Sequence, residues 1–485
     1  MLPLFDQLSG RRWFLFHAAV FVAALAYSLL QQSFFWLAVP FVVLFVPVFI
    51  RYTHQFYFLL LLLLPLGSEL ELSPTLSTDF PDELLMWMIT GAFFLIVIIN
   101  RKLVPAYAFS HPLFFLILLH VGWAVVSCVS SEDSWLSVKW VLAKIWYIVP
   151  FVVLPSMFIN TKSNMNKALW CLAVPMLLVC IQSLLRHSFY NFSFEGIKET
   201  VSPFFRNHVA YSAMLVCLMV PVVAAYFYHP KGSAVRKPLA IIIAIGLAGI
   251  VFAYSRGAWV AAIMGIAAAF IIRKKLMAWM MALTIIIVTT FSIWLAKDNN
   301  YLRFANQHDQ TIFHSNLGQH LEATLEGKDV SNAERFYRWV AGTRMSQEKL
   351  WTGYGPNNFY PHYKNFTVTA FTTWVSDNPE HSSVHNYFLL MLIEQGIPGL
   401  LFFVTLFFAM FLYAQRLYHR LHDRYWKFAA MCIGIILTMI GGLIFMSDLI
   451  ETDKIGSLFW LCAGILMVLE RFTPNAGRKK LGNGT

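Results

Sequence analysis

Charged side chains are scarce in this sequence. Asp, Glu, Lys and Arg make up only 13% of the 485 residues, whereas a soluble globular domain carries about 25%. Hydrophobic residues supply 58% of the chain. This composition excludes an ordinary soluble protein and predicts that most of the chain lies in lipid.

Cysteine is also rare, and none of it is placed for a structural bridge. All six cysteines fall inside apolar segments, and no CxxC pair is present. The sequence therefore predicts neither a loop disulfide nor a cysteine-ligated metal site. The six residues are Cys128, Cys171, Cys180, Cys217, Cys432 and Cys462.

Acidic residues are fewer than basic ones, which gives a formal net charge of +11. A basic chain can bind nucleic acid, but here the basic residues form short clusters between apolar runs. That distribution is the one that the positive-inside rule describes for membrane proteins. We therefore predict membrane lipids, and no nucleic acid, among the partners.

Apolar runs long enough for membrane helices recur along the chain. They predict an all-α polytopic membrane protein with about 14 transmembrane helices. The first run follows two arginines and is interpreted as an uncleaved helix rather than an export signal. The runs lie near 13–30, 34–50, 55–67, 84–99, 112–130, 138–159, 168–186, 209–228, 238–254, 257–272, 276–296, 397–415, 428–446 and 455–470.

The connections between these runs alternate in charge, which predicts a topology with both termini in the cytoplasm. The basic set carries Arg11/Arg12, Arg51, Arg101/Lys102, Lys162/Lys167, Lys231/Arg236/Lys237, Arg273/Lys274/Lys275, Arg416/Arg420/Arg424/Lys427 and Arg471/Arg478. The acidic set carries Glu69/Glu71/Asp79/Asp82/Glu83, Glu132/Asp133, Glu195/Glu199 and Asp448/Glu451/Asp453.

The chain divides into four parts. Residues 1–296 hold the first eleven predicted helices, and 297–383 form one large loop on the outer, periplasmic side. Residues 384–470 hold a half-helix and the C-terminal helices, and 471–485 form a cytoplasmic tail. A loop of this length in a compact protein is usually functional, and we expect it to cover a site on the outer face.

The large loop has predicted structure of its own. Ser331-Asn332-Ala333-Glu334 fits a capping box and predicts a helix that runs to about Leu350. Turn-forming residues at Gly353–Phe359 follow this predicted helix and end it. The half-helix follows, from His385 to Gln395, and at roughly 17 Å it is too short to cross a hydrocarbon core of about 30 Å.

Three side chains on the predicted outer side could take part in chemistry. Arg256 and Arg206 each fit an anion site, since a guanidinium binds phosphate through two donors, or an interfacial arginine that reaches water. His385 fits a general base or an interfacial histidine that hydrogen-bonds its neighbours. His381 is its rival, and Glu394 is expected to be structural.

The ordered motifs in the second half of the chain resemble the O-antigen ligase family. "YSRGAW", "ERFYRWVAGTRMSQEKLWTGYGPNNF" and "HNYFLLMLIEQGIPG" follow one another in the order of that family's signature. The family's superfamily also holds O-antigen polymerases and some protein O-oligosaccharyltransferases. Matching positions are Ser255 to Trp259, Arg335, Trp339, Gly353, Gly355, Asn358, Phe359, His385, Asn386, Glu394, Gly396 and Gly399. About fourteen spans exceed the twelve expected of a typical ligase, and the segment around Arg206 matches loosely.

The resemblance implies a GT-C type glycosyltransferase in the bacterial inner membrane, with its active site facing the periplasm. Such an enzyme moves a glycan from undecaprenyl diphosphate to an acceptor hydroxyl and uses no metal or other cofactor. The resemblance also implies that His385 is the catalytic base. The substrate-binding residues that we assign on this basis are Arg256, Arg206, Arg335, Arg338, His381 and Asn386.

The acceptor stays open at this stage. A ligase uses lipid A-core, a polymerase uses a second lipid-linked glycan, and a protein glycosyltransferase uses a Ser or Thr side chain. A transporter, from a different class, would also have many spans and a broken helix. The chain shows no inverted repeat, however, and few acids in the spans before the large loop, which disfavours a proton relay.

Overall fold

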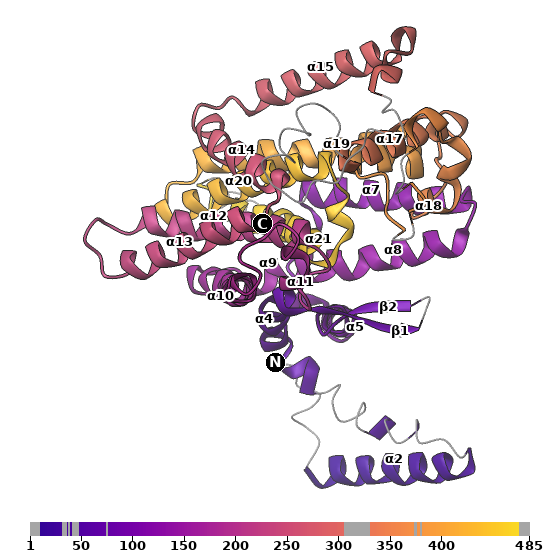
Figure 1. Ribbon diagram of the computed structural model, residues 1–485. Coiled ribbons are helices and arrows are strands. Elements are labelled where there is room, and N and C mark those ends of the chain that lie inside the picture. Colours follow the sequence, from indigo (N-terminus) through magenta and orange to yellow (C-terminus); the bar gives the residue numbers. More distant parts are fainter. Residues whose placement is uncertain are drawn as a thin grey trace, which may run out of the picture.

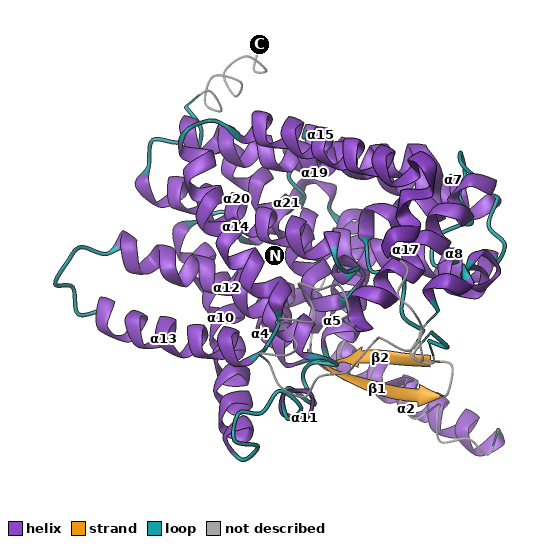
Figure 2. Cartoon of the chain, turned by 45° about the horizontal axis from the view of Figure 1, so that its top comes forward, coloured by secondary structure: helices purple, strands orange, loops and turns teal. Residues whose placement is uncertain are grey.

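The computed structural model describes residues 10–31, 36, 39–40, 48–73, 76–304, 330–372, 376–378 and 381–474. Helices build nearly all of it, and one two-stranded hairpin stands at the edge of the helical bundle (Figures 1 and 2). In the hairpin, β1 (Ser68–Ser73) pairs antiparallel with β2 (Leu76–Phe80), and Ser68 lies opposite Phe80.

The N-terminal half is a series of helices. They are α2 (Gly10–Leu30), α4 (Thr53–Leu63), η2 (Leu64–Leu66), α5 (Asp82–Ile99), η3 (Arg101–Leu103), α6 (Ala106–Phe109), α7 (Pro112–Val129), α8 (Ser134–Ile148), the π-helical η4 (Val149–Val153), α9 (Pro155–Phe158), α10 (Lys162–Ser188), α11 (Ile197–Thr200) and α12 (His208–Tyr228).

The C-terminal half continues this pattern and adds short helices in the large loop. Its elements are α13 (Arg236–Phe252), α14 (Arg256–Arg273), α15 (Met277–Ala296), η5 (Lys297–Phe304), α17 (Val330–Glu348), α18 (Phe359–His362), η6 (Tyr363–Phe366), η7 (Thr369–Phe371), α19 (Tyr387–Arg420), α20 (Arg424–Phe445), η8 (Leu449–Glu451) and α21 (Asp453–Glu470).

The predicted apolar runs coincide with these helices, except for 34–50, most of which lies outside the described residues. Within the described part of the chain, nine helices are long and apolar enough to cross a membrane. The all-α polytopic class is therefore confirmed, whereas the count of fourteen spans stays a prediction. The helices α4, α13 and α21 match predicted runs but are shorter or carry more charge than these nine.

The core of the bundle surrounds α21. Every residue of this helix from Lys454 to Leu469 is buried, including Trp460, because α20, α19 and the η4–α9 segment pack around it. A helix that is apolar on all faces is stable only inside such a layer of other helices. The polar connections at its ends are therefore held in fixed positions.

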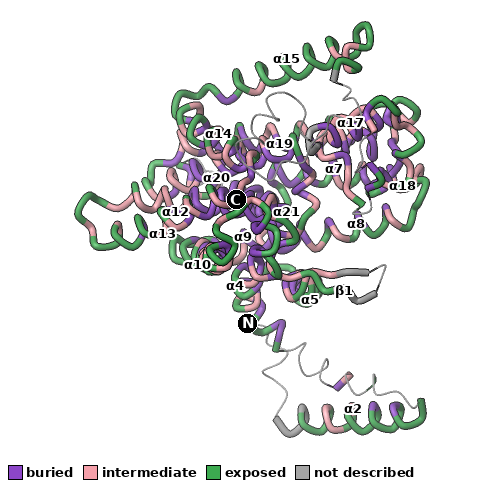
Figure 3. Tube along the Cα trace, in the orientation of Figure 1, coloured by how far each residue is buried: buried purple, intermediate pink, exposed green. Residues whose placement is uncertain are grey.

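Two helices, α2 and α15, are mostly exposed instead of buried. Most side chains of α2 and α15 are exposed, for example Leu30 at 80% and Trp279 at 76%, and both helices run along the outside of the molecule (Figures 1 and 3). Exposed apolar side chains on a helix whose backbone hydrogen bonds are internal are suited to contact with lipid.

Short polar side chains fix where several helices begin. The Asp133 carboxylate accepts from the backbone N–H groups of Trp135 and Leu136 at the start of α8, and the Asn207 side chain accepts from that of Ala210 in α12. Such caps satisfy N–H groups that have no partner inside the helix.

The expected half-helix is present. In α19 the backbone leaves the helical region at Gly396, with φ 68° and ψ −171°, so Tyr387–Gln395 forms a short helix before the longer segment that starts at Ile397. The large loop is also helical where expected, because α17 covers Val330–Glu348. Of the predicted capping box, the side chains of Ser331 and Asn332 lie outside the described set, and Glu334 is described.

Candidate active site

The large loop is attached to the break in α19 by backbone hydrogen bonds. Tyr354 N–H donates to the Ile393 carbonyl at 3.0 Å, and Gly355 N–H donates to that of Glu394 at 2.9 Å. A third bond runs from Ile397 N–H to the Leu350 carbonyl at 2.9 Å. The turn after α17 and the end of the half-helix therefore form one unit.

Glycine is required where these two segments meet. Gly353 and Gly396 have φ of 68°, a conformation that side chains strongly disfavour. A Cβ at Gly353 would stand 2.3 Å from the Glu394 carbonyl carbon, and one at Gly396 would stand 2.3 Å from the Trp351 carbonyl oxygen. The glycines of both sequence motifs thus have a structural explanation.

Glu394 completes the same unit. Its buried carboxylate accepts from Asn357 N–H at 2.8 Å and from Phe359 N–H at 3.1 Å. This is the structural role expected of it.

Asn358, also in the motif, is fully buried and links the loop to the α7–α8 connection. Its side-chain amide donates to Ser137 at 3.0 Å, and its oxygen accepts from Asp133 N–H at 2.9 Å. The motif residues therefore hold the large loop against the ends of α7, α8 and α19.

His385 stands just before the half-helix and faces the α20–α21 connection. Its Nδ1 is 3.8 Å from Asp448 Oδ1, and both side chains are about a third exposed, at 32% and 31%. This is an ion-pair distance, longer than a hydrogen bond. Its backbone N–H donates to Ser383 Oγ at 3.2 Å, and its φ of 54° is rare for a histidine.

Asp448 is set up to carry a negative charge. Burial by itself raises the pKa of a carboxyl, but the interaction with His385 and a hydrogen bond from Ser383 outweigh it, so the pKa of Asp448 is lowered. A carboxylate beside Nδ1 orients the imidazole ring and leaves Nε2 for another partner.

The end of α20 is the point where several predicted site elements meet. Trp339 of α17 lies with its ring centroid 6.2 Å from that of Phe445, three residues before Asp448. A Cβ at Gly257, next to Arg256, would contact Leu443 at 3.7 Å. The elements that carry Arg256, Arg335 and His385 therefore converge around the last turn of α20.

The arginines of this region differ in their surroundings. Arg256 is the first residue of α14 and is partly exposed. Arg338 is buried, and its guanidinium contacts Glu334 at 3.3 Å, while Ser376 Oγ donates to the other oxygen of Glu334 at 2.8 Å. Arg338 is thus part of an internal network in this structure.

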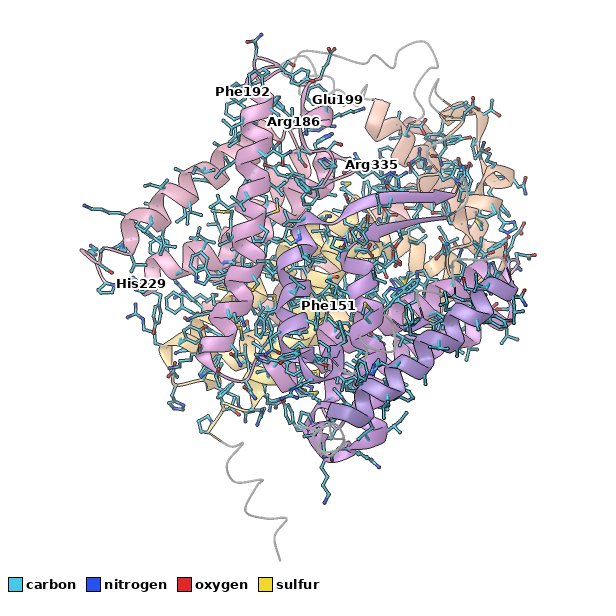
Figure 4. The ribbon with its side chains drawn as sticks, turned by 90° about the horizontal axis from the view of Figure 1, so that it is seen from below. Phe151, Arg186, Phe192, Glu199, His229 and Arg335 are labelled. Carbon is cyan, nitrogen blue, oxygen red and sulfur yellow. The ribbon has the colours of Figure 1, made fainter. Side chains whose placement is uncertain are left out.

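Arg335, one turn before Arg338 on α17, is only partly buried. In Figure 4 Arg335, Arg186 and Glu199 appear in the upper part of the view, and His229 appears at its left edge, about halfway down.

Arg206 lies near the β-hairpin rather than at the end of α20. Its Nε is 4.0 Å from Glu69 in β1, and its side chain is 71% exposed. The neighbouring Phe205 ring packs under Lys454 Nζ at 4.8 Å, at the start of α21. Among the described residues no contact joins Arg206 to His385, so the role of Arg206 in substrate binding stays a prediction.

His381 and Asn386 flank His385 and have other contacts. The His381 ring stacks on Tyr360 with centroids 4.2 Å apart. The Asn386 oxygen accepts from Leu389 N–H at 3.0 Å and so caps the half-helix. His385 therefore stands one residue outside the helix cap instead of inside the helix.

The acids of the α20–α21 connection were predicted only as members of the acidic set, not as partners of site residues. Besides Asp448, Glu451 accepts from Lys144 Nζ and from Trp140 Nε1, both at 2.8 Å, which places a buried cation of α8 beside the connection. The signal that could have found them was the acidic cluster on the predicted outer side, in a short connection between two apolar runs.

Metal binding has no support from clustering in the part of the chain that the structure describes. No group of three or more His, Cys, Asp or Glu side chains there is placed to hold an ion. Metal independence itself stays a prediction.

The fold and the site together define a polytopic all-α membrane protein whose large loop and broken helix bring a histidine–aspartate pair and arginines to one end. Residues 239–404, about a third of the chain, match the model of a family described as O-antigen ligase. This match confirms the resemblance to the O-antigen ligase and polymerase superfamily over that segment, which contains Arg256, Arg335 and His385. No match was found among curated proteins.

Proposed function

We propose that the protein transfers a glycan from undecaprenyl diphosphate to an acceptor hydroxyl on the periplasmic face of the bacterial inner membrane, as in ligation of O-antigen to lipid A-core. The observation that carries the proposal is the pairing of His385, which lies inside the segment that matches the O-antigen ligase family, with Asp448, which lies beyond that segment. The family match by itself supports an O-antigen ligase or polymerase type of function.

The transfer needs a base on the acceptor. The acceptor oxygen attacks the anomeric carbon, the bond from that carbon to the diphosphate breaks, and the hydroxyl proton passes to His385. Because Nδ1 faces Asp448, Nε2 is the nitrogen left to take the proton. Asp448 then stabilises the imidazolium that forms, and a positioned base of this kind contributes about 10²–10⁴ in rate.

The leaving group needs positive charge. Undecaprenyl diphosphate leaves with its bonding electron pair and gains negative charge as the bond breaks, so no proton donor is required. Arg256 supplies a permanent cation at the N-terminus of the 18-residue helix α14, where the backbone N–H groups add partial positive charge. Arg335 is the second cation that we assign to the diphosphate.

The experiment uses the full-length protein in vesicles with an undecaprenyl diphosphate glycan donor and three acceptors: lipid A-core, a second lipid-linked glycan, and a Ser-containing peptide. Nucleotide sugar is omitted. We expect transfer to lipid A-core, and His385→Ala should lose most of this activity, by about 10²-fold or more. His381→Ala is the comparison variant and should cost much less, because its ring stacks on Tyr360 and it precedes the half-helix by several residues.

Each result decides a part of the proposal. Transfer only to the second glycan would assign polymerisation, and transfer only to the peptide would assign protein glycosylation. Loss of activity in His381→Ala together with full activity in His385→Ala would exchange the two roles. If folded protein that binds the donor transferred glycan to none of the acceptors, the proposed glycosyltransferase activity would be refuted.

A further inference from the structure

A cavity of about 470 Å³ opens at the end of the bundle opposite the candidate active site. The ends of α4, α5, α9 and α21 surround it, all on the side that the charge pattern predicts to be cytoplasmic. Its lining residue Arg471 stands at the other end of α21 from Asp448. The function proposed above makes no use of it.

The rim of this cavity is basic. Arg51, Lys102 and Arg471 line it and are exposed, and His54 adds a fourth nitrogen-bearing side chain. None of its described lining residues is acidic. Glu470, which precedes Arg471 in the sequence, has another partner, since its carboxylate is 2.6 Å from His111 Nε2.

One of these cations is held in place by an aromatic ring. The Arg471 guanidinium carbon lies 4.5 Å from the centre of the Tyr107 ring, and its NH1 donates to the Tyr107 hydroxyl at 3.3 Å. That hydroxyl in turn donates to the Ser156 carbonyl at 3.1 Å, which fixes the arrangement to α9. The cation is therefore positioned before any ligand arrives, which reduces the entropy cost of binding.

The walls below the rim are apolar. Ile50, Ile96, Leu103 and Met157 line them. A cavity with an apolar wall between helices and a basic rim at the membrane surface fits a molecule with a phosphate headgroup and an acyl chain. A soluble anion would leave the apolar wall in contact with water.

We propose that this cavity binds one anionic phospholipid of the cytoplasmic leaflet, with the phosphodiester at Lys102 and Arg471 and the start of one acyl chain against Ile96 and Met157. The proposal does not depend on the glycan-transfer function. It assigns the lipid a structural contact between the N-terminal helices and the end of α21.

The test measures lipid binding to the delipidated full-length protein by native mass spectrometry, with phosphatidylglycerol or phosphatidylcholine of identical acyl chains. We expect a preference for phosphatidylglycerol. Each of Lys102→Gln and Arg471→Gln should weaken its binding by about fivefold. Lys102→Arg keeps the charge and should restore most of the affinity.

The matched controls remove the same charge from basic connections away from the cavity, Lys231→Gln and Lys274→Gln. They should bind phosphatidylglycerol as the native protein does. Melting temperatures measured without lipid distinguish misfolding from a loss of lipid binding. Met157→Trp is a second cavity variant that fills the space assigned to the acyl chain without changing the charge, and it should also weaken binding.

Three results would overturn the proposal. They are equal binding of both lipids, equal losses in the control and cavity variants, and displacement of phosphatidylglycerol by millimolar inorganic phosphate. The last result would assign the cavity to soluble anions.

Discussion

Asp448→Asn gives the most direct test of the candidate active site, because it removes one charge and almost no volume. Two unit charges 3.8 Å apart, as His385 Nδ1 and Asp448 Oδ1 are, interact by about 4 kcal/mol at an effective dielectric constant of about 20. Both side chains are about a third exposed, so screening by water reduces this to about 1–2 kcal/mol. That free energy corresponds to about five- to thirtyfold in the rate of transfer.

The assay is the steady-state rate of transfer from the lipid-linked donor, measured with saturating donor and with donor binding determined separately. We expect Asp448→Asn to lower kcat within this range and to leave donor binding unchanged, because Asp448 contacts the base and not the diphosphate. Glu132→Gln is the matched control. It removes a carboxylate that pairs with Lys349 on the same side of the molecule, and it should keep the native rate.

The pH dependence adds a readout that a purely structural role would not change. The lowered pKa of Asp448 means that its carboxylate is charged throughout the neutral range, and its stabilising effect is lost only as pH falls through that lowered pKa. In Asp448→Asn this pH-dependent contribution of the carboxylate is absent, so the rate profile at acidic pH should differ from that of the native protein. A variant with the native kcat and the native pH profile would refute the assignment of Asp448.

The remaining predictions address the loop attachment, the diphosphate site and metal. Gly396→Ala should lower the free energy of unfolding by about 1–3 kcal/mol, because it strains a positive φ and brings a Cβ against the Trp351 carbonyl. The control, Gly91→Ala, has open space around its Cβ and should not destabilise the protein. Equal melting temperatures of the two variants would contradict this interpretation. Glu394→Ala should cost about 1–3 kcal/mol for each of the two backbone N–H groups that it leaves unpaired, seen as a lower melting temperature. Arg256→Lys keeps the charge but loses the planar pair of donors, so the transfer rate should fall about tenfold or more, and a lysine variant with full activity would limit Arg256 to an interfacial role. Transfer should continue in excess chelator, and activity that vanished and returned with Mg²⁺ would reverse the metal-independent mechanism.

Much of the architecture followed from the sequence because lipid imposes simple rules on the chain. Runs of apolar residues must form helices, since backbone groups find no water in the hydrocarbon core, and the described runs do coincide with helices. The end of the half-helix could also be predicted from the sequence. The half-helix was predicted to end at Gln395, and the backbone leaves the helical region at the next residue, Gly396. The ordered motifs predicted the family, which the match at 239–404 supports.

The tertiary structure decided which side chains meet. Glu394 and Gly353 are far apart in sequence, and only the folded chain shows that they belong to one attachment between the large loop and α19. The partner of His385 could not be predicted for the same reason, since Asp448 is 63 positions away in the sequence. The acidic residues around Asp448 predicted the side of the membrane, but not a contact with His385. Hydropathy and charge act over short stretches and along the membrane normal, so they determine which residues are in lipid and on which side. Lateral packing of the helices, which depends on the shapes of many side chains at once, decided the pairing of His385 with Asp448.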